Sequence, residues 1–282
     1  MSAPESMPVL QVRDLTIDYP GRGGLTRAVD GVSFALGAGR VLGVVGESGS
    51  GKSSIGMAAM GLTEASHAVI GGEMKFAGTD LAKLKGQGWR SLRGERVSMV
   101  FQDAMATLNP VLRVGDQIAD MFRYHRPQMS RKARRAAVLD LLEQVGIRDA
   151  DKRIDNYPHE LSGGMRQRIV IAAAIALEPE LLIADEPTTA LDVTVQAQIL
   201  DLMQDLIRER EMAMLFISHD LDVVGDICDD VVVMRHGKIV EAGRVDDVLI
   251  RPRHPYTQEL LAARPQFRTA EVAAVQSGGS HA

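Results

Sequence analysis

Hydrophobic positions change their spacing along the chain, and each change predicts a different kind of element. Over residues 9–19 apolar and polar positions nearly alternate, which is typical of a strand with one buried face. A second strand is expected over residues 29–36, and residues 40–45 form a short apolar run that ends at a cluster of glycine and serine. Helical spacing begins at Lys52. The order strand, glycine loop, helix is the first half of a parallel α/β unit.

The pattern becomes helical over residues 103–161, where strand-like runs disappear. Such runs return at residues 181–184, 213–217 and 231–234, with helical patterns between them, which indicates an open α/β sheet. A short helix is expected near residues 256–263. We therefore predict a core over 8–102 and 166–250, an inserted helical subdomain over 103–165, and a C-terminal extension over 251–282 with a disordered tail.

Composition narrows the class of protein. Of 282 residues, 45% are hydrophobic and 24% charged, which is ordinary for a globular protein. The net charge of −5 argues against nucleic acid as a partner. The lone Cys228 excludes a disulfide framework and a cysteine-rich zinc site. The longest apolar run, residues 169–177, is far shorter than the ~20 residues of a membrane span, and the start lacks signal-peptide features. We expect a soluble protein of a reducing compartment.

Residues 46–53 read G-E-S-G-S-G-K-S and match the phosphate-loop pattern G-x-x-x-x-G-K-[ST] between a strand and a helix. Glycines let backbone N–H groups turn toward phosphate oxygens, and the helix adds its positive dipole end. Lys52 is expected to bridge the β- and γ-phosphates, and the Ser53 hydroxyl to bind Mg²⁺. The predicted nucleotide-binding residues here are Gly46, Glu47, Ser48, Gly49, Ser50, Gly51, Lys52, Ser53 and Ser54.

Two acids follow the apolar run 181–184, so both carboxylates are expected at the carboxyl end of a strand, where open α/β sheets bind ligands. Asp185 is predicted to hold Mg²⁺, and Glu186 to take the proton from an attacking water. Solvation of a strand end is the alternative explanation for such a pair. The nearby phosphate loop favours the catalytic role of the two acids over mere solvation of the strand end.

The segment L-S-G-G-M-R-Q-R at residues 161–168 matches the signature sequence of ATP-binding-cassette (ABC) ATPases. The chain resembles this family throughout in the order of its motifs: phosphate loop, Gln102, signature, Asp185-Glu186, Asp192, and His219. The resemblance implies an α/β fold, namely a P-loop NTPase core with an N-terminal antiparallel β subdomain and an inserted α-helical subdomain. It also implies ATP and Mg²⁺ as cofactors, and a head-to-tail dimer that sandwiches two ATP molecules.

By the same resemblance, Ser162, Gly163 and Gly164 would face the γ-phosphate of ATP bound to the partner ATPase, although Ser162 is also typical of a plain helix cap. Gln102 would contact Mg²⁺ or the water and His219 the γ-phosphate. Asp192 would line the dimer interface and Tyr19 would stack on adenine. A tyrosine packed in the core at a strand end is the alternative for Tyr19.

Longer stretches, including residues 157–168, 184–198 and H-P-Y-T-Q at 254–258, resemble the oligopeptide/dipeptide permease ATPases. This resemblance implies an importer with two multi-span membrane permease subunits, a second and often different ABC ATPase, and an extracytoplasmic substrate-binding protein. The chain would lie peripherally on the cytoplasmic face of the cell membrane and hydrolyse ATP for peptide uptake. Nickel, glutathione and oligosaccharide importers use similar ATPases. A non-transport ABC ATPase is disfavoured because the chain lacks long coiled-coil insertions, a second cassette and cysteine-rich zinc modules.

Positive charge concentrates in the predicted helical subdomain. A solvated helix face is the simpler interpretation, and contact with anionic lipid is the alternative. The residues concerned are Arg123, Arg126, Arg131, Lys132, Arg134 and Arg135.

Overall fold

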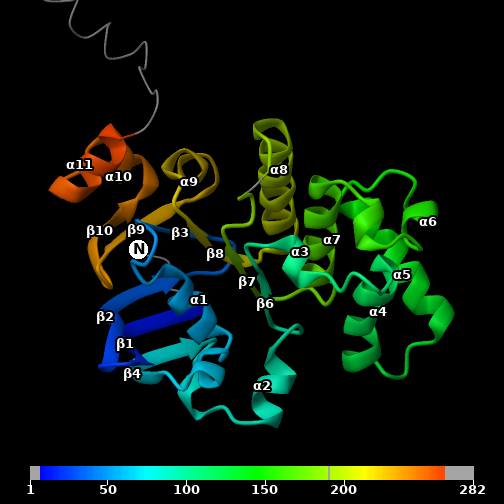
Figure 1. The fold of residues 1–282 in the computed structure, drawn as a ribbon, viewed down its shortest axis with the longest axis horizontal. Helices are drawn as coiled ribbons and strands as arrows, with labels where there is room; N and C mark the ends of the chain where they lie inside the picture. The colour runs from blue at the N-terminus through cyan, green and yellow to red at the C-terminus, as the bar shows by residue number, and fades with distance from the viewer. Residues whose placement is uncertain (1–6, 190, 264–282) are drawn as a thin grey trace, which may run out of the picture.

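The computed structural model describes residues 7–189 and 191–263, and it contains two β-sheets (Figure 1). The larger is six-stranded in the order β10-β9-β3-β8-β7-β6. All of its neighbouring strands run parallel except the pair β9 and β10. The bounds are β3 Val41–Val45, β6 Val97–Val100, β7 Leu181–Asp185, β8 Ala213–Ser218, β9 Asp230–Arg235 and β10 Lys238–Arg244.

The smaller sheet is four-stranded and antiparallel, in the order β2-β1-β4-β5, and lies at the lower left of Figure 1. Its long strands β1 and β2 form a hairpin whose turn lies at the Gly-rich residues 21–24. The bounds are β1 Leu10–Gly21, β2 Gly24–Leu36, β4 Val69–Phe76 and β5 Thr79–Asp80. The antiparallel β subdomain and the α/β core expected from the family resemblance are both confirmed.

Helices cover the parallel sheet and form a group of their own at the far right of Figure 1. The short 3₁₀ segments are Thr63–Ser66, Leu81–Lys83 and Pro158–Glu160. The helices are α1 Lys52–Ala59, α2 Gln87–Leu92, α3 Ala104–Thr107, α4 Val114–His125, α5 Arg131–Gln144, α6 Ala150–Arg153, α7 Gly163–Ile175, α8 Val193–Arg210, α9 Leu221–Ile227, α10 Val245–Ile250 and α11 Pro255–Ala262. None of the described strands lies within residues 103–165. The division into core, helical subdomain and extension stays a prediction, and its expected tail lies outside the described residues.

The parallel sheet separates two hydrophobic cores, because successive side chains of a strand point to opposite faces. In β7, Ile183 faces the core that also contains α1 and the antiparallel sheet, while Leu182 faces the core formed with α7, α8 and α9. Gly56 lets α1 approach closely, since a Cβ there would lie 3.1 Å from side-chain carbons of Ile183 and Ile217. The helix that follows the phosphate loop is therefore fixed directly on β7, which ends in Asp185, and on the neighbouring β8.

Several elements differ from the sequence expectation. Strand β2 begins at Gly24 rather than at residue 29, and β4, β5 and β10 had no counterpart in the pattern analysis. In β4 the run is broken by Gly71 and Gly72, and Gly72 has φ of 79° at a register shift opposite β1. The extra residue of this bulge lies in β1. Strand β4 itself lacks a clear alternation because its apolar Val69 and Ile70 are exposed. Helix α7 begins at Gly163, well before the apolar run at 169–177.

Truncation of a core residue tests this packing. Ile183 has no exposed surface, so Ile183→Ala should leave a cavity and lower the free energy of unfolding by about 2–5 kcal/mol. The control is Val193→Ala, whose side chain is 83% exposed and whose loss should change stability by less than about 0.5 kcal/mol. Denaturant unfolding of both variants measures the difference. Equal losses of stability in the two variants would contradict the burial of the Ile183 side chain in the core between β7 and α1.

Candidate functional site

The phosphate loop, residues 46–53, connects β3 to α1 and bends where only glycine fits. Gly46 has φ of 151°, and a Cβ there would lie 2.2 Å from the carbonyl oxygen of Met234. Gly51 has φ of 99°, and its Cβ would lie 2.3 Å from the carbonyl oxygen of Ala28. Both contacts are with rigid backbone, so a larger residue at either position would displace the loop.

Lys52 is the first residue of α1 and is only 5% exposed. Its Nζ donates hydrogen bonds to the carbonyl oxygens of Gly46 at 2.7 Å and Glu47 at 2.9 Å, so the ammonium lies inside the curve of the loop. Burial lowers the pKa of Lys52, and nearby carboxylates, Glu186 first among them, oppose this. The site therefore holds a partly desolvated cation, whose attraction for an anionic ligand is stronger than that of a cation in water.

Asp185 ends β7 and is buried, and its Oδ1 accepts a hydrogen bond of 3.0 Å from Ser53 Oγ. Burial raises the pKa of the Asp185 carboxyl, an effect that the bond from Ser53 partly offsets. A hydroxyl and a carboxylate side by side supply the hard oxygen donors that Mg²⁺ prefers. Among the described residues no three His, Cys, Asp or Glu side chains gather to hold a metal.

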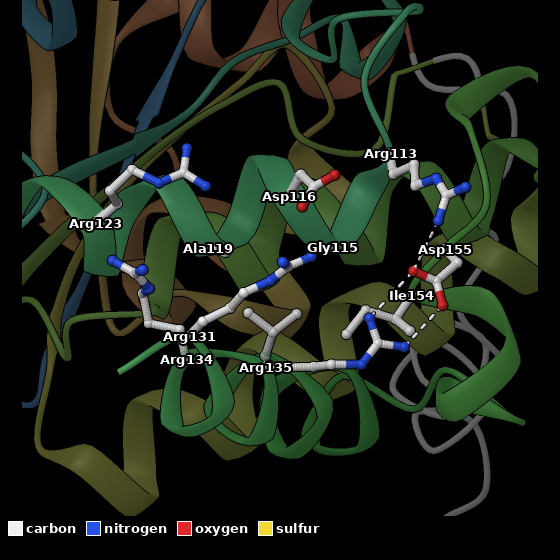
Figure 2. A pocket seen from close by; sticks show the side chains of 11 residues that line it. Arg113, Gly115, Asp116, Ala119, Arg123, Arg131, Arg134, Arg135, Ile154 and Asp155 are labelled. Carbon is white, nitrogen blue, oxygen red and sulfur yellow. Dashed lines mark hydrogen bonds and ion pairs between the residues drawn. The ribbon is translucent and has the colours of Figure 1, made fainter. Parts of the chain in front are cut away.

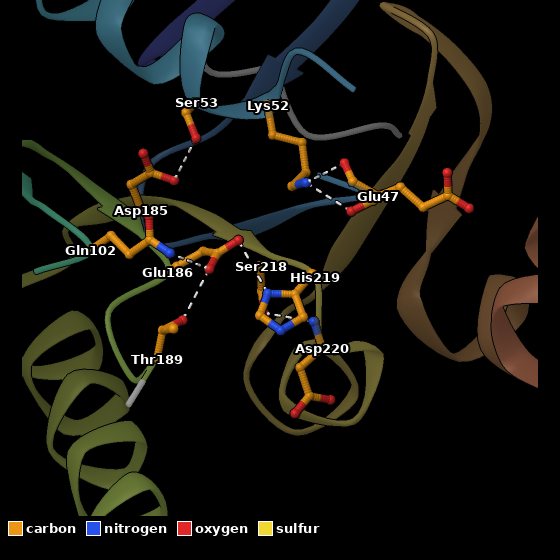
Figure 3. Close-up of polar contacts among 11 residues, drawn as sticks. Glu47, Lys52, Ser53, Gln102, Asp185, Glu186, Thr189, Ser218, His219 and Asp220 are labelled. Atoms are coloured by element: carbon orange, nitrogen blue, oxygen red, sulfur yellow. Dashed lines mark hydrogen bonds and ion pairs between the residues drawn. The ribbon is translucent and has the colours of Figure 1, made fainter. Parts of the chain in front are cut away.

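Glu186 stands at the centre of a polar network at the carboxyl edge of the sheet (Figure 3). Its Oε2 accepts hydrogen bonds from Gln102 Nε2 at 2.8 Å and Thr189 Oγ1 at 3.0 Å. Its Oε1 lies 3.1 Å from Nδ1 of His219. Gln102 follows β6 and His219 follows β8, on either side of β7, so neighbouring parallel strands bring these side chains together.

The backbone of Glu186 is strained. Its φ is 47°, a left-handed conformation that costs a residue other than glycine about 1–3 kcal/mol. The amide of Glu186 donates to the carbonyl oxygen of Ile217 at 2.8 Å, which ties the strained residue to β8. Strain held in this way is found most often at functional sites, where it fixes a side chain in one direction.

These groups border one open cavity of about 630 Å³. Ten of the predicted site residues line it: Tyr19, Ser48, Gly49, Gly51, Lys52, Ser53, Ser54, Gln102, Glu186 and His219. Thr189 and Ala28 complete the wall. The other predicted residues do not line the cavity. The carbonyl oxygens of Gly46 and Glu47 accept hydrogen bonds from Lys52, Ser50 is buried, and Asp185 joins the site through Ser53. Their binding roles stay predictions.

The signature residues do not border this cavity. Ser162 caps α7, its Oγ accepting a hydrogen bond of 3.3 Å from the amide of Met165, and Asp192 caps α8 in the same way through Val195 at 2.9 Å. Ser162, Gly163 and Asp192 are exposed on this chain. The capping role is therefore present in the structure, and a contact with nucleotide on a second ATPase stays a prediction.

Two contacts at the site were missed by the sequence analysis. Thr189 follows the acidic pair within the run 184–198, but its bond to Glu186 was not anticipated. Tyr256, on α11, is 1% exposed, and its Oη accepts a hydrogen bond of 3.1 Å from the amide of Glu47 in the phosphate loop. Its ring packs under the guanidinium of Arg235 at 4.6 Å. The motif at residues 254–258 was the only signal that could have pointed to it.

Comparison with known proteins agrees with this geometry. The family model described as ABC transporter matches residues 29–189. The chain belongs to the ABC transporter family. It is an ABC ATPase with the α/β fold and the ATP-binding cassette that this membership implies. The oligopeptide transport ATP-binding protein OppD of Bacillus subtilis is 48% identical over 93% of this ABC ATPase and 73% of its own length. The dipeptide transport ATP-binding protein DppD of Haemophilus influenzae is 46% identical, and the match covers 93% of this chain and 79% of that protein.

Solved structures of other cassettes share the fold of this ABC ATPase. cbiO1 from Clostridium perfringens, part of the ABC transporter complex cbiONQ, superposes with a TM-score of 0.76 at 25% identity, covering 96% of this chain and all of the other. The ATP-binding cassette MJ0796, in a dimeric post-hydrolysis state bound to ADP and Pi, superposes with a TM-score of 0.74 at 23% identity. The match covers 84% of this chain and 98% of that structure. No helix in the described part of our chain is long and apolar enough to cross a bilayer.

The contact between α11 and the phosphate loop leads to a test. Tyr256→Phe removes only the hydroxyl that accepts from the Glu47 amide, and a hydrogen bond contributes about 0.5–1.5 kcal/mol. We expect the dissociation constant for MgATP to rise about 2- to 10-fold, as measured by titration with a fluorescent ATP analogue. Tyr124→Phe is the matched control, since Tyr124 is 62% exposed. Equal affinities in the two variants would remove Tyr256 from this role.

Proposed function

We propose that this ABC ATPase is the ATP-hydrolysing subunit of an importer for di- and oligopeptides. The observation that carries the proposal is the Glu186 carboxylate, held at the edge of the phosphate-loop cavity by Gln102, Thr189 and His219. The names of OppD and DppD, which are peptide transport ATP-binding proteins, support peptides as the cargo. Nickel, glutathione or oligosaccharide uptake is the alternative with the same ATPase role. A non-transport ABC ATPase is less favoured.

In this proposal the phosphate loop binds the triphosphate of ATP. Backbone amides of the loop and the N-terminal end of α1 face the phosphates, and Lys52 supplies a positive charge to the β- and γ-phosphates. Tyr19 lines the same cavity and is placed to stack on adenine. Ser53, Asp185 and Gln102 would hold Mg²⁺, because their oxygen atoms suit a hard cation. Bound there, Mg²⁺ would neutralise charge on the phosphate oxygens.

Glu186 is the proposed general base. Bonds to both carboxylate oxygens fix its orientation, so the carboxylate can take a proton from a water molecule in line with the γ-phosphate. His219 lines the cavity, with its imidazole 56% exposed, and would contact the γ-phosphate and stabilise charge in the transition state. Thr189 would hold the base through its hydrogen bond to Oε2.

The proposal extends to assembly. Ser162, Gly163 and Gly164 lie at the start of α7, where free amides and the helix dipole favour an anion, and would contact ATP held by the second ABC ATPase. Asp192 would lie at the same interface. Two multi-span permease subunits and an extracytoplasmic substrate-binding protein would complete the importer, with this chain peripheral on the cytoplasmic face of the cell membrane.

The cargo and partners are tested by pull-down of the tagged chain from gently solubilised native membranes, followed by mass spectrometry. Two multi-span subunits, a second ABC ATPase and a binding protein that takes up labelled peptides are expected. Nickel, glutathione or an oligosaccharide bound by that protein would replace the peptide cargo. Recovery of only ribosomes, DNA or soluble partners would contradict the importer.

Removal of the base tests the chemistry. Glu186→Gln keeps the shape of the side chain but cannot accept the proton, so we expect ATP binding to persist and turnover to fall about 10²- to 10⁴-fold. This equals about 3–5 kcal/mol of barrier. The control is Glu209→Gln on α8, an exposed carboxylate outside the site. Turnover of Glu186→Gln within threefold of the control would exclude Glu186 as the base.

A bulky cation at the signature tests the dimer. Ser162→Arg should block ATP-dependent closure, measured as cross-linking between the two ATPase subunits of the assembled complex, while the isolated chain still binds ATP. Ser130→Arg is the matched control, because Ser130 also caps a helix, with Oγ accepting from Ala133 at 3.2 Å. Loss of ATP binding by the isolated Ser162→Arg chain, or equal cross-linking in both variants, would contradict the assignment.

A further inference from the structure

A second cavity lies between α4 and α5, in the helical group and away from the phosphate loop (Figure 2). Its volume is about 280 Å³. Hydrophobic side chains of Val138 and Ile154 form part of its wall, and Ala119 leaves space on α4. The remaining wall is dominated by guanidinium groups: Arg113, Arg123, Arg131, Arg134 and Arg135.

The arrangement of these arginines differs from that of a solvated helix face. Arg131, Arg134 and Arg135 share one side of α5 with the cavity-lining Val138, as residues three and four apart do. Figure 2 shows the side chains of Arg131 and Arg134 extending from α5 toward α4, while the side chain of Arg123 lies along α4. All three of these arginines line the same cavity.

Acidic side chains neutralise only part of this charge. Asp155 pairs with Arg135 at 2.7 Å and Arg113 at 3.2 Å, and Arg123 pairs with Asp120. In the described part of the chain, neither Arg131 nor Arg134 has an acidic partner within ion-pair distance. The wall thus combines five guanidinium groups with two carboxylates, Asp116 and Asp155, in a protein whose net charge is −5. Like charges gathered in this way repel each other unless an anion lies between them.

We propose that this cavity binds a phosphate group, carried by a soluble polyphosphate or by an anionic lipid headgroup. The guanidinium fork donates paired hydrogen bonds that match phosphate oxygens, and a tetrahedral phosphate accepts such forks from several directions at once. Arg123, Arg131 and Arg134 come from two helices, which suits a tetrahedral anion better than a planar carboxylate. The bound phosphate would link α4 to α5. This inference does not depend on the proposed function.

Calorimetric titration with pyrophosphate tests the soluble source. The phosphate loop is first saturated with a non-hydrolysable ATP analogue and Mg²⁺, so that only a second site is measured, at 0.15 M salt to limit unspecific attraction. We expect one further pyrophosphate per chain. The double variant Arg131→Gln/Arg134→Gln should weaken this binding about tenfold or more, because bonds to charged groups are lost. Arg90→Gln/Arg208→Gln, which removes two exposed arginines outside the cavity, should not.

Sedimentation with vesicles tests the lipid source. If pyrophosphate does not bind, the unmodified chain and the Arg90/Arg208 variant should still sediment with phosphatidylglycerol vesicles and not with phosphatidylcholine vesicles. The Arg131/Arg134 variant should remain in solution. Circular dichroism confirms that both variants keep their helices. The proposal is overturned if neither probe binds, or if the two double variants lose binding equally, because the effect would then be one of overall charge.

Discussion

The phosphate loop depends on backbone contacts from segments far away in the chain. Gly46 packs against the carbonyl oxygen of Met234 at the end of β9, and Gly51 packs against that of Ala28 in β2. The amide of Gly237, in the turn after β9, donates to the carbonyl oxygen of Ser50 at 3.1 Å. With Tyr256 bonded to Glu47, the loop is held from the antiparallel sheet, the β9–β10 hairpin and α11. Such external support keeps the loop amides directed at the cavity, where a free glycine-rich segment would lose much more conformational entropy on binding.

Glu186, like the phosphate loop, is held in place by contacts from other elements of the fold. Glu186 has a strained backbone and one bond from its amide to β8, so its direction is set by the sheet. Its carboxylate is then shared among groups that follow β6, β7 and β8. Because these strands are neighbours, a shift of any one of them would move a donor away from Glu186. The placement of the proposed base is thus a property of the parallel sheet.

Local patterns predicted the part of the site in which sequence neighbours are also spatial neighbours. The phosphate loop and the acidic pair each lie at one strand end, so a strand followed by glycines or acids was enough to place them. The contact of Tyr256 with Glu47 joins residues 209 positions apart, and no spacing rule covers such a pair. Strand β4 was missed because its apolar residues Val69 and Ile70 are exposed and two glycines follow them, and β10 because none of its residues is fully buried. Both depend on pairing with a partner strand, which a single segment does not encode.

Ser162 and Asp192 show why a motif can be recognised while its role stays open within one chain. Each side chain accepts a hydrogen bond from the first turn of its own helix, and an isolated chain gains stability from that cap. At the start of α7, the amides that remain open would also suit an anion on another subunit, whereas the carboxylate of Asp192 would repel one. For Ser162, capping and the proposed anion contact therefore call for the same kind of residue at the same helix position. The cap is complete within one chain, whereas the proposed nucleotide contact requires the proposed second ATPase, so only an assembled complex can distinguish the two roles.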